Sequence, residues 1–141
     1  MKKILLLFAF ISFAIVNAQD KGKDCEFNFK VSSNMILEDE VRSIYKAEIQ
    51  WDFSKLNLKN TTCVIEIIPI KDCVNELNAI KFKDAIVVSS KDENFAVKGT
   101  KSLNHIDLMS KCFKWRVVIT NEKTSCVETT DWKYSSFLSQ K

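Results

Sequence analysis

Three residue types that catalytic and phosphate-binding motifs require are almost absent from this sequence. Its 141 residues include two glycines, one proline and one histidine. Gly22 and Gly99 cannot form a glycine-rich phosphate-binding loop, because such loops need at least two glycines within a few residues of each other. A zinc site with two or three imidazole ligands is excluded, because His105 is the only histidine. The composition therefore predicts no nucleotide, metal or other cofactor.

The first 18 residues have the composition of a secretory signal peptide. Lys2 and Lys3 precede an apolar run at residues 4–16, and the small side chain of Ala18 follows. As a helix this run measures about 20 Å, which is too short for the ~30 Å hydrocarbon core of a membrane. It resembles the signals of bacterial exported proteins. We expect cleavage after Ala18 and export of residues 19–141 to the periplasm or the cell exterior, without membrane insertion of the mature chain.

The charge balance of the mature chain argues against a nucleic-acid partner. Loss of Lys2 and Lys3 lowers the formal net charge from +3 to +1. So small a charge creates no field that would hold a polyanion. The remaining lysines are spread along the chain between apolar residues, and we interpret them as solvent-facing residues of strands.

Apolar and polar residues alternate along several segments, which is typical of half-buried β-strands. The alternation is clearest near Trp51 and Trp115, and it places both side chains in the core. About seven or eight short strands predict a single all-β domain, an antiparallel sandwich or barrel. Strands are expected at residues 24–31, 45–53, 62–70, 113–119 and 126–134, with weaker ones near 80–88, 94–98 and 102–108, and helical turns at 33–41 and 74–80.

The last expected strand contains a conflict in its alternation. Val127 and Thr129 point to one side, whereas Trp132 and Tyr134 point to the other. Either the strand has a bulge near Thr130, or both aromatic rings face outward. The rings then either fold over the bottom of the core or form a small exposed platform for a glycan or a peptide. Trp132 and Tyr134 are therefore candidate binding residues.

Three segments follow one another in an order found in a known family. A tryptophan closes the strand at 49–51, an apolar-x-apolar-Glu strand follows at 63–67, and an aromatic-x-aromatic-Arg-Val strand comes at 113–117. This order resembles a fibronectin type III domain over residues 24–137, which implies an immunoglobulin-like antiparallel β-sandwich. The chain departs from the family at Phe113, where the tyrosine corner needs a hydroxyl group. The family includes adhesion, receptor and enzyme-accessory domains, so the resemblance implies no single function.

The resemblance also implies a pairing of the five cysteines, which an oxidising compartment favours. In a type III-like sandwich the end of the third strand lies beside the start of the late strand, which implies a disulfide between Cys73 and Cys112. The same arrangement implies a second disulfide between Cys63 and Cys126, although the late strand could hold these two apart. Cys25 would remain unpaired on the inward face of the first strand.

No motif marks a catalytic or metal site. His105 could pair with a cysteine in a hydrolase, but no surrounding motif selects the cysteine. The acidic runs at 38–40 and 92–93 lack the spacing and the turn glycine of a calcium loop. We expect a non-catalytic exported domain that acts by surface binding, in adhesion or as an accessory subunit, with a protein or glycan partner. The alternative is a small secreted hydrolase that uses a Cys–His pair or two carboxylates.

Overall fold

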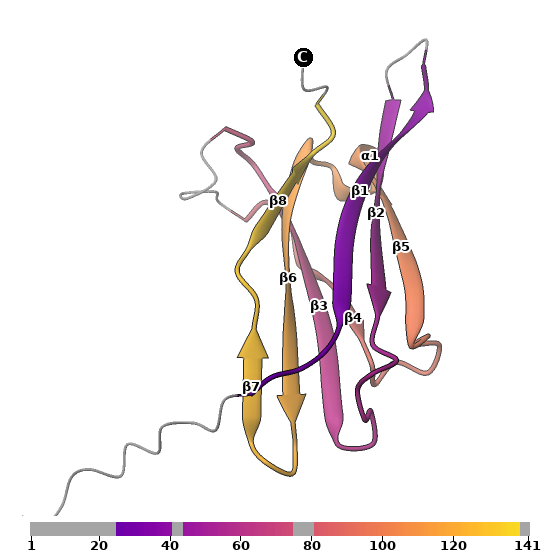
Figure 1. Cartoon of the computed structure of the whole chain (residues 1–141). Helices are drawn as coiled ribbons and strands as arrows, with labels where there is room; N and C mark the ends of the chain where they lie inside the picture. Colours follow the sequence, from indigo (N-terminus) through magenta and orange to yellow (C-terminus); the bar gives the residue numbers. More distant parts are fainter. Residues whose placement is uncertain (1–24, 41–43, 75–80, 139–141) are drawn as a thin grey trace, which may run out of the picture.

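The structure of the protein is a computed structural model in which residues 25–40, 44–74 and 81–138 are described. The predicted signal peptide and its cleavage site lie outside these residues, as does most of the helical turn expected at 74–80. The described chain forms eight strands in two antiparallel sheets, with one short helix (Figure 1). This architecture is an all-β sandwich, as the alternating sequence pattern predicts.

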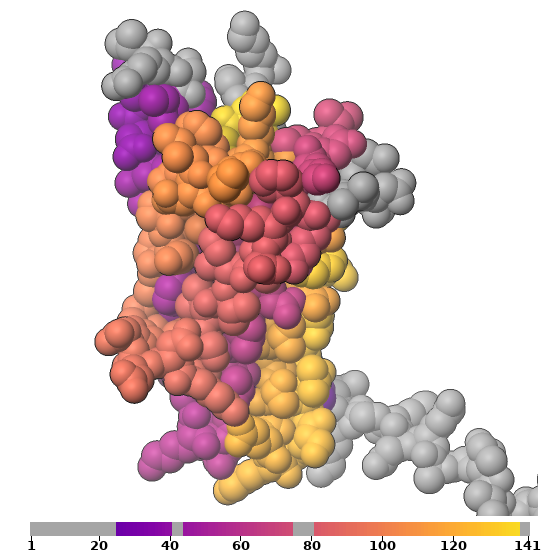
Figure 2. All heavy atoms as spheres, turned by 180° about the vertical axis from the view of Figure 1, so that it is seen from behind, coloured from indigo at the N-terminus to yellow at the C-terminus, as the bar shows by residue number. Residues whose placement is uncertain are grey.

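The two sheets differ in size. The smaller sheet has the strand order β1-β2-β5, with β1 at Lys30–Asp39, β2 at Ile44–Asp52 and β5 at Lys98–Asn104. The larger sheet has the order β4-β3-β6, and both β7 and β8 pair with β6. Its strands are β4 (Ile86–Ser89), β3 (Thr61–Ile70), β6 (Cys112–Asn121), β7 (Cys126–Thr129) and β8 (Lys133–Ser136). The chain between β4 and β5 crosses from one sheet to the other and covers one side of the sandwich (Figure 2).

The core lies between the sheets and is made by alternate residues of β2, β3 and β6. The strands pair so that residues directly opposite each other share a face, and each buried position therefore meets another buried position. Trp115 is 2% exposed, so the prediction that it belongs to the core is confirmed. The other buried members are Ala47, Ile49, Phe53, Cys63, Ile65, Ile67, Leu103, Leu108, Phe113, Val117, Ile119 and Phe137.

Trp51 lies at the rim of the core and is half-buried, so the prediction of a fully buried side chain is only partly right. Its indole N–H donates a hydrogen bond of 2.8 Å to the carbonyl oxygen of Ala96. Its ring stacks on Phe95 with 6.1 Å between the centroids, and it lies directly over Gly99 on the neighbouring strand. The alternation correctly predicts that Trp51 lies on the core-facing side of its strand. Because β5 is an edge strand, this side remains partly open to solvent near Trp51.

The first expected strand and two weaker elements are placed differently. No strand covers residues 25–29, and β1 occupies the region where a helical turn was expected at 33–41. The strand expected at 102–108 ends at Asn104, because the Asn104 side chain accepts a hydrogen bond from the Asp107 N–H and caps α1 (His105–Leu108). The weak strand expected at 94–98 contributes only Lys98, the first residue of β5.

Candidate functional site

The conflict in the last expected strand is resolved by a bulge. Val118 pairs with Thr129 and Trp115 pairs with Lys133, so three residues of the last strand lie opposite two residues of β6. Thr130 holds the bulge, because its hydroxyl oxygen accepts a hydrogen bond of 3.0 Å from the Val117 N–H. The Thr130 N–H donates in turn to the Val117 carbonyl oxygen at 3.0 Å. This side chain replaces the carbonyl group that a regular strand would offer.

The extra residue turns both candidate aromatic residues outward. Tyr134 pairs with Lys114, and Val127 pairs with Thr120, at positions of β6 whose side chains point away from the core. Trp132 contacts the side chains of that same outer face. The bulge and the outward rings therefore occur together, and neither ring folds over the core. Both rings are half-buried.

Trp132 lies against two cationic side chains of β6. Lys114 Nζ is 4.9 Å from the centroid of the Trp132 ring, and the guanidinium carbon of Arg116 is 4.4 Å from it. Arg116 Nε donates a hydrogen bond of 2.6 Å to Glu66 Oε2 on β3. We call Glu66, Lys114, Arg116 and Trp132 the cation–aromatic strip. It crosses β3, β6 and the connection between β7 and β8, and each cation–π contact contributes about 0.5–1 kcal/mol.

The charges within this strip do not cancel. Glu66 pairs with Arg116, whereas no carboxylate among the described residues forms an ion pair with Lys114. The strip therefore carries one uncompensated positive charge beside an aromatic ring. Arg116 and Glu66 keep 32% and 30% of their side-chain surface exposed, so a partner can reach the strip.

The outer faces of the two sheets have opposite character. Around the cation–aromatic strip the larger sheet presents β-branched apolar side chains, namely Val64, Ile68, Val87, Val118 and Val127. Val87 and Val127 are 53% and 55% exposed. The outer face of the smaller sheet is polar apart from Ile36 and Ile44, and Lys46–Glu48 and Lys98–Asp52 form ion pairs on it. An exposed apolar face rimmed by polar groups is typical of an interaction surface.

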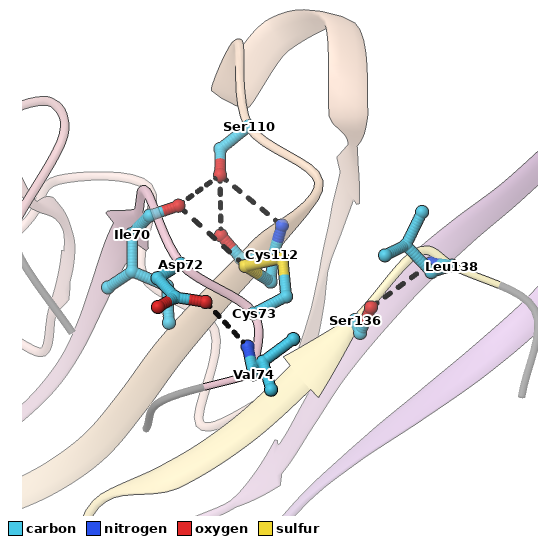
Figure 3. The surroundings of a disulfide bond; sticks show 8 residues. All are labelled: Ile70, Asp72, Cys73, Val74, Ser110, Cys112, Ser136 and Leu138. Carbon is cyan, nitrogen blue, oxygen red and sulfur yellow. Dashed lines mark hydrogen bonds between the residues drawn. A yellow bond between two sulfur atoms is a disulfide. The ribbon is translucent and has the colours of Figure 1, made fainter. Parts of the chain in front are cut away.

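One disulfide fixes the end of the sandwich near α1. Cys73 and Cys112 are bonded, with 5.6 Å between their Cα atoms, as the resemblance implied (Figure 3). The Ser110 hydroxyl lies beside this bond and hydrogen-bonds to the carbonyl oxygens of Ile70 and Cys112 at 2.6 and 2.8 Å. These contacts tie the end of β3 to the start of β6.

The expected bond between Cys63 and Cys126 does not form, and Cys25 is not free. The structure joins Cys25 to Cys126, with 5.9 Å between the Cα atoms, and leaves Cys63 as a buried thiol. Cys63 lies on β3 and Cys126 on β7, with β6 between them. Two strand spacings make about 9.5 Å, which is beyond the reach of a disulfide. Residues 25–29 run beside β7 instead, and the Phe27 N–H donates to Glu128 Oε2 at 3.1 Å.

The geometry does not support a Cys–His nucleophile. Burial raises the pKa of the Cys63 thiol to about 11, which disfavours the thiolate that would attack a substrate. His105 lies beside Ile70 at the other end of β3, and the seven residue steps from Cys63 to Ile70 span about 23 Å. Cys73, which lies closer to His105, is in a disulfide.

The described ranges contain no cluster of metal ligands and no membrane-spanning helix. Within residues 25–40, 44–74 and 81–138, no three His, Cys, Asp or Glu side chains gather where they could hold a metal ion. No helix in the same ranges is long and apolar enough to cross a membrane. Comparisons of the chain with protein families, with curated proteins and with solved structures find no match.

Proposed function

We propose that the protein is an exported, non-catalytic binding domain that docks a protein partner on the outer face of its larger sheet. The observation that carries this proposal is the cation–aromatic strip, set among exposed valines on one face of the sandwich only. A flat apolar face with aromatic and arginine side chains at its centre has the composition of protein interfaces. The polar outer face of the smaller sheet has no such composition.

A protein partner fits the strip better than a glycan does. Sugar recognition by aromatic side chains requires an open ring face, and cationic groups of Lys114 and Arg116 already lie over the Trp132 ring. The surrounding valines offer neither hydrogen-bond donors nor acceptors from their side chains. A protein surface with apolar side chains and one carboxylate near Lys114 would match both features.

Two further features support export and the type III-like resemblance. The two disulfides suit an oxidising compartment. The smaller sheet contains β1, β2 and β5, and the larger sheet contains β3, β4, β6 and β7, with β8 also paired to β6. This division of the strands is compatible with the arrangement on which the resemblance rests. Adhesion and accessory-subunit roles are therefore the classes of function that we propose.

The test is site-specific photo-crosslinking in the organism that produces the protein. A photoreactive residue replaces Thr129, which is exposed on the outer face of the larger sheet, or Thr100, which is exposed on the outer face of the smaller sheet. We expect one dominant crosslinked protein from position 129, its loss when Val87→Glu is added, and none from position 100. Equal products from both positions, or none from position 129, would contradict the proposal.

The non-catalytic part of the proposal has its own test. His105 is the residue on which a Cys–His hydrolase would depend, and its ring lies 6.2 Å from the ring of Phe137, as expected of a packing residue. Assays of the wild-type protein and of His105→Ala against ester, peptide and glycoside substrates should show no activity that depends on this residue. Any activity that the substitution abolishes supports the hydrolase instead.

A further inference from the structure

The end of the sandwich near α1 concentrates exposed apolar side chains. Of the ten large apolar residues that are exposed in the described part of the chain, seven lie at this end: Met35, Leu37, Val74, Phe82, Ile106, Met109 and Leu138. Two segments at this end, residues 81–83 and α1, lie next to each other in Figure 2. Two cavities open here, and both are lined by Ile70 and Cys73.

The two cavities differ in charge. The larger, of about 490 Å³, is lined in the described part of the chain by hydroxyl groups and apolar side chains and by no charged residue. The other, which we call the His105 cavity, has a volume of about 390 Å³. It is lined by Ile70, Lys71, Cys73, Phe82, His105, Met109, Ser110 and Lys111. Among the described residues, its lining thus includes two lysines and no carboxylate, and its volume lies in the range of small-molecule sites.

The apolar wall of the His105 cavity is held in place by backbone contacts. The Phe82 N–H donates a hydrogen bond of 2.9 Å to the Pro69 carbonyl oxygen, and Lys81 forms a β-bridge with Ile70. Phe82 nevertheless remains 43% exposed, with Lys71 Nζ 6.0 Å from the centre of its ring. An exposed aromatic ring beside an ammonium group, on a backbone that is already held in place, suits an anion with an apolar tail.

Met109 gives an independent indication of a binding role. It ends α1 with φ 51° and ψ 28°, the left-handed conformation that helix ends usually assign to glycine. A methionine costs about 1 kcal/mol there, and its side chain is 66% exposed. A strained backbone position that carries a large exposed apolar side chain points to a functional contact of that side chain. The cavity lined by Met109 is the contact that the structure offers.

We propose that the His105 cavity binds a small amphiphilic carboxylate, such as a medium-chain fatty acid. The tail packs on Phe82, Met109 and Ile70, and the carboxylate lies between the ammonium groups of Lys71 and Lys111. The Ser110 hydroxyl is already bonded to two carbonyl oxygens, so among the described lining residues the two lysines and His105 are left to hold the anion. This site is separate from the cation–aromatic strip and does not depend on the proposed protein partner.

The experiment is an NMR titration of the exported, disulfide-bonded protein with octanoate below its micellar concentration. Acetate tests whether the anion alone suffices, and octyltrimethylammonium tests whether the tail alone suffices. Two double variants have the same loss of charge. Lys71→Gln with Lys111→Gln changes the cavity, whereas Lys55→Gln with Lys123→Gln changes exposed loop lysines at the other end of the sandwich. Met109→Gly removes an apolar wall without adding strain.

We expect octanoate to shift the amide signals around Phe82, α1 and Lys111. The double cavity variant should bind octanoate about tenfold more weakly, as loss of two exposed ion pairs implies, and the control should bind as wild type does. Met109→Gly should bind several-fold more weakly while its melting temperature stays the same or rises. Equal binding of octanoate and octyltrimethylammonium, shifts by acetate alone, or no shifts at this cavity would each overturn the proposal.

Discussion

Gly99→Ala tests how tightly Trp51 closes the rim of the core. A Cβ atom added to Gly99 would lie 2.7 Å from Trp51 Cε2 and 3.1 Å from Cη2, and closer still to Cζ2. Real Cβ atoms do not approach ring carbons so closely, so the ring or the strand must move. The backbone of Gly99 has no positive φ, so alanine adds no backbone strain and would otherwise favour the strand. The expected loss of stability therefore comes from the ring contact alone.

The ring of Trp51 cannot move away without breaking other contacts. Its N–H bond to the Ala96 carbonyl contributes about 1 kcal/mol, and its stack on Phe95 adds about 0.5–1.5 kcal/mol. The structure can relieve the overlap by losing part of this energy or by shifting β5. We expect Gly99→Ala to lower the free energy of unfolding by about 1–3 kcal/mol, the usual cost of overpacking. For a domain of this size each kcal/mol lowers the melting temperature by about 4 °C.

A double-mutant cycle separates the ring contact from any other effect. Thermal unfolding by circular dichroism is measured for wild type, Gly99→Ala, Trp51→Ala and the double variant. In the Trp51→Ala background the added methyl group meets no ring, so Gly99→Ala should cost nothing or stabilise slightly. The reasoning is refuted if Gly99→Ala changes the melting temperature by less than 2 °C, or if its cost is the same in both backgrounds.

Three further predictions concern the cysteines and one acidic residue. Replacing Cys73 and Cys112 by serine opens a loop with a sequence separation of 39. The free energy of unfolding, measured by thermal unfolding, should fall by about 4 kcal/mol, and a fall of less than about 1 kcal/mol would contradict the loop-entropy reasoning. Burial raises the pKa of the Cys63 thiol to about 11, so this thiol should resist iodoacetamide at pH 8 in the folded protein and react with it in denaturant. Labelling of Cys63 in both states would show that the thiol is accessible in the folded protein. Hydrogen bonds from Ser54 and an ion pair with Lys98 lower the pKa of Asp52 in the folded protein. The stabilising contribution of this carboxylate is therefore complete above about pH 5 and is lost as the pH falls. Asp52→Asn should flatten the acid limb of a curve of stability against pH, and an unchanged limb would argue against this role of Asp52.

The sequence allows prediction of side-chain direction better than prediction of strand pairing. Cys25, Phe27 and Phe29 alternate with polar residues, and Phe27 and Phe29 do pack against the core. The segment pairs with no strand, because any extended backbone gives a period of two, whether or not a neighbour completes the ladder. The wrong assignment of Cys25 as an unpaired core residue followed from treating that extended segment as a strand.

Two local features could have been foreseen and one could not. Asn104 and Asp107 have the spacing of a helix cap, which predicts a helix start at His105 in place of a continued strand. The bulge near Thr130 was one of two open interpretations of the last strand. The contacts of Trp132 with Lys114 and Arg116 depend on which residue is inserted and on how β8 pairs with β6. That information lies in residues far apart along the chain, so local alternation does not contain it.

The bond between Cys25 and Cys126 decides how the molecule carries mechanical load. Both the segment before Cys25 and the segment after Cys126 lead away from a single covalent link, so a pull on the two ends bypasses all the residues between the two cysteines, whose sequence separation is 101. Only the rest of β7 and β8 can then be peeled from β6, and because both already run extended along β6 the tether lengthens by no more than about 10 Å. In a reducing medium the whole sandwich would extend under the same pull, by roughly 350 Å. Anchored at one end and loaded at the other, the oxidised protein therefore behaves as an almost inextensible link.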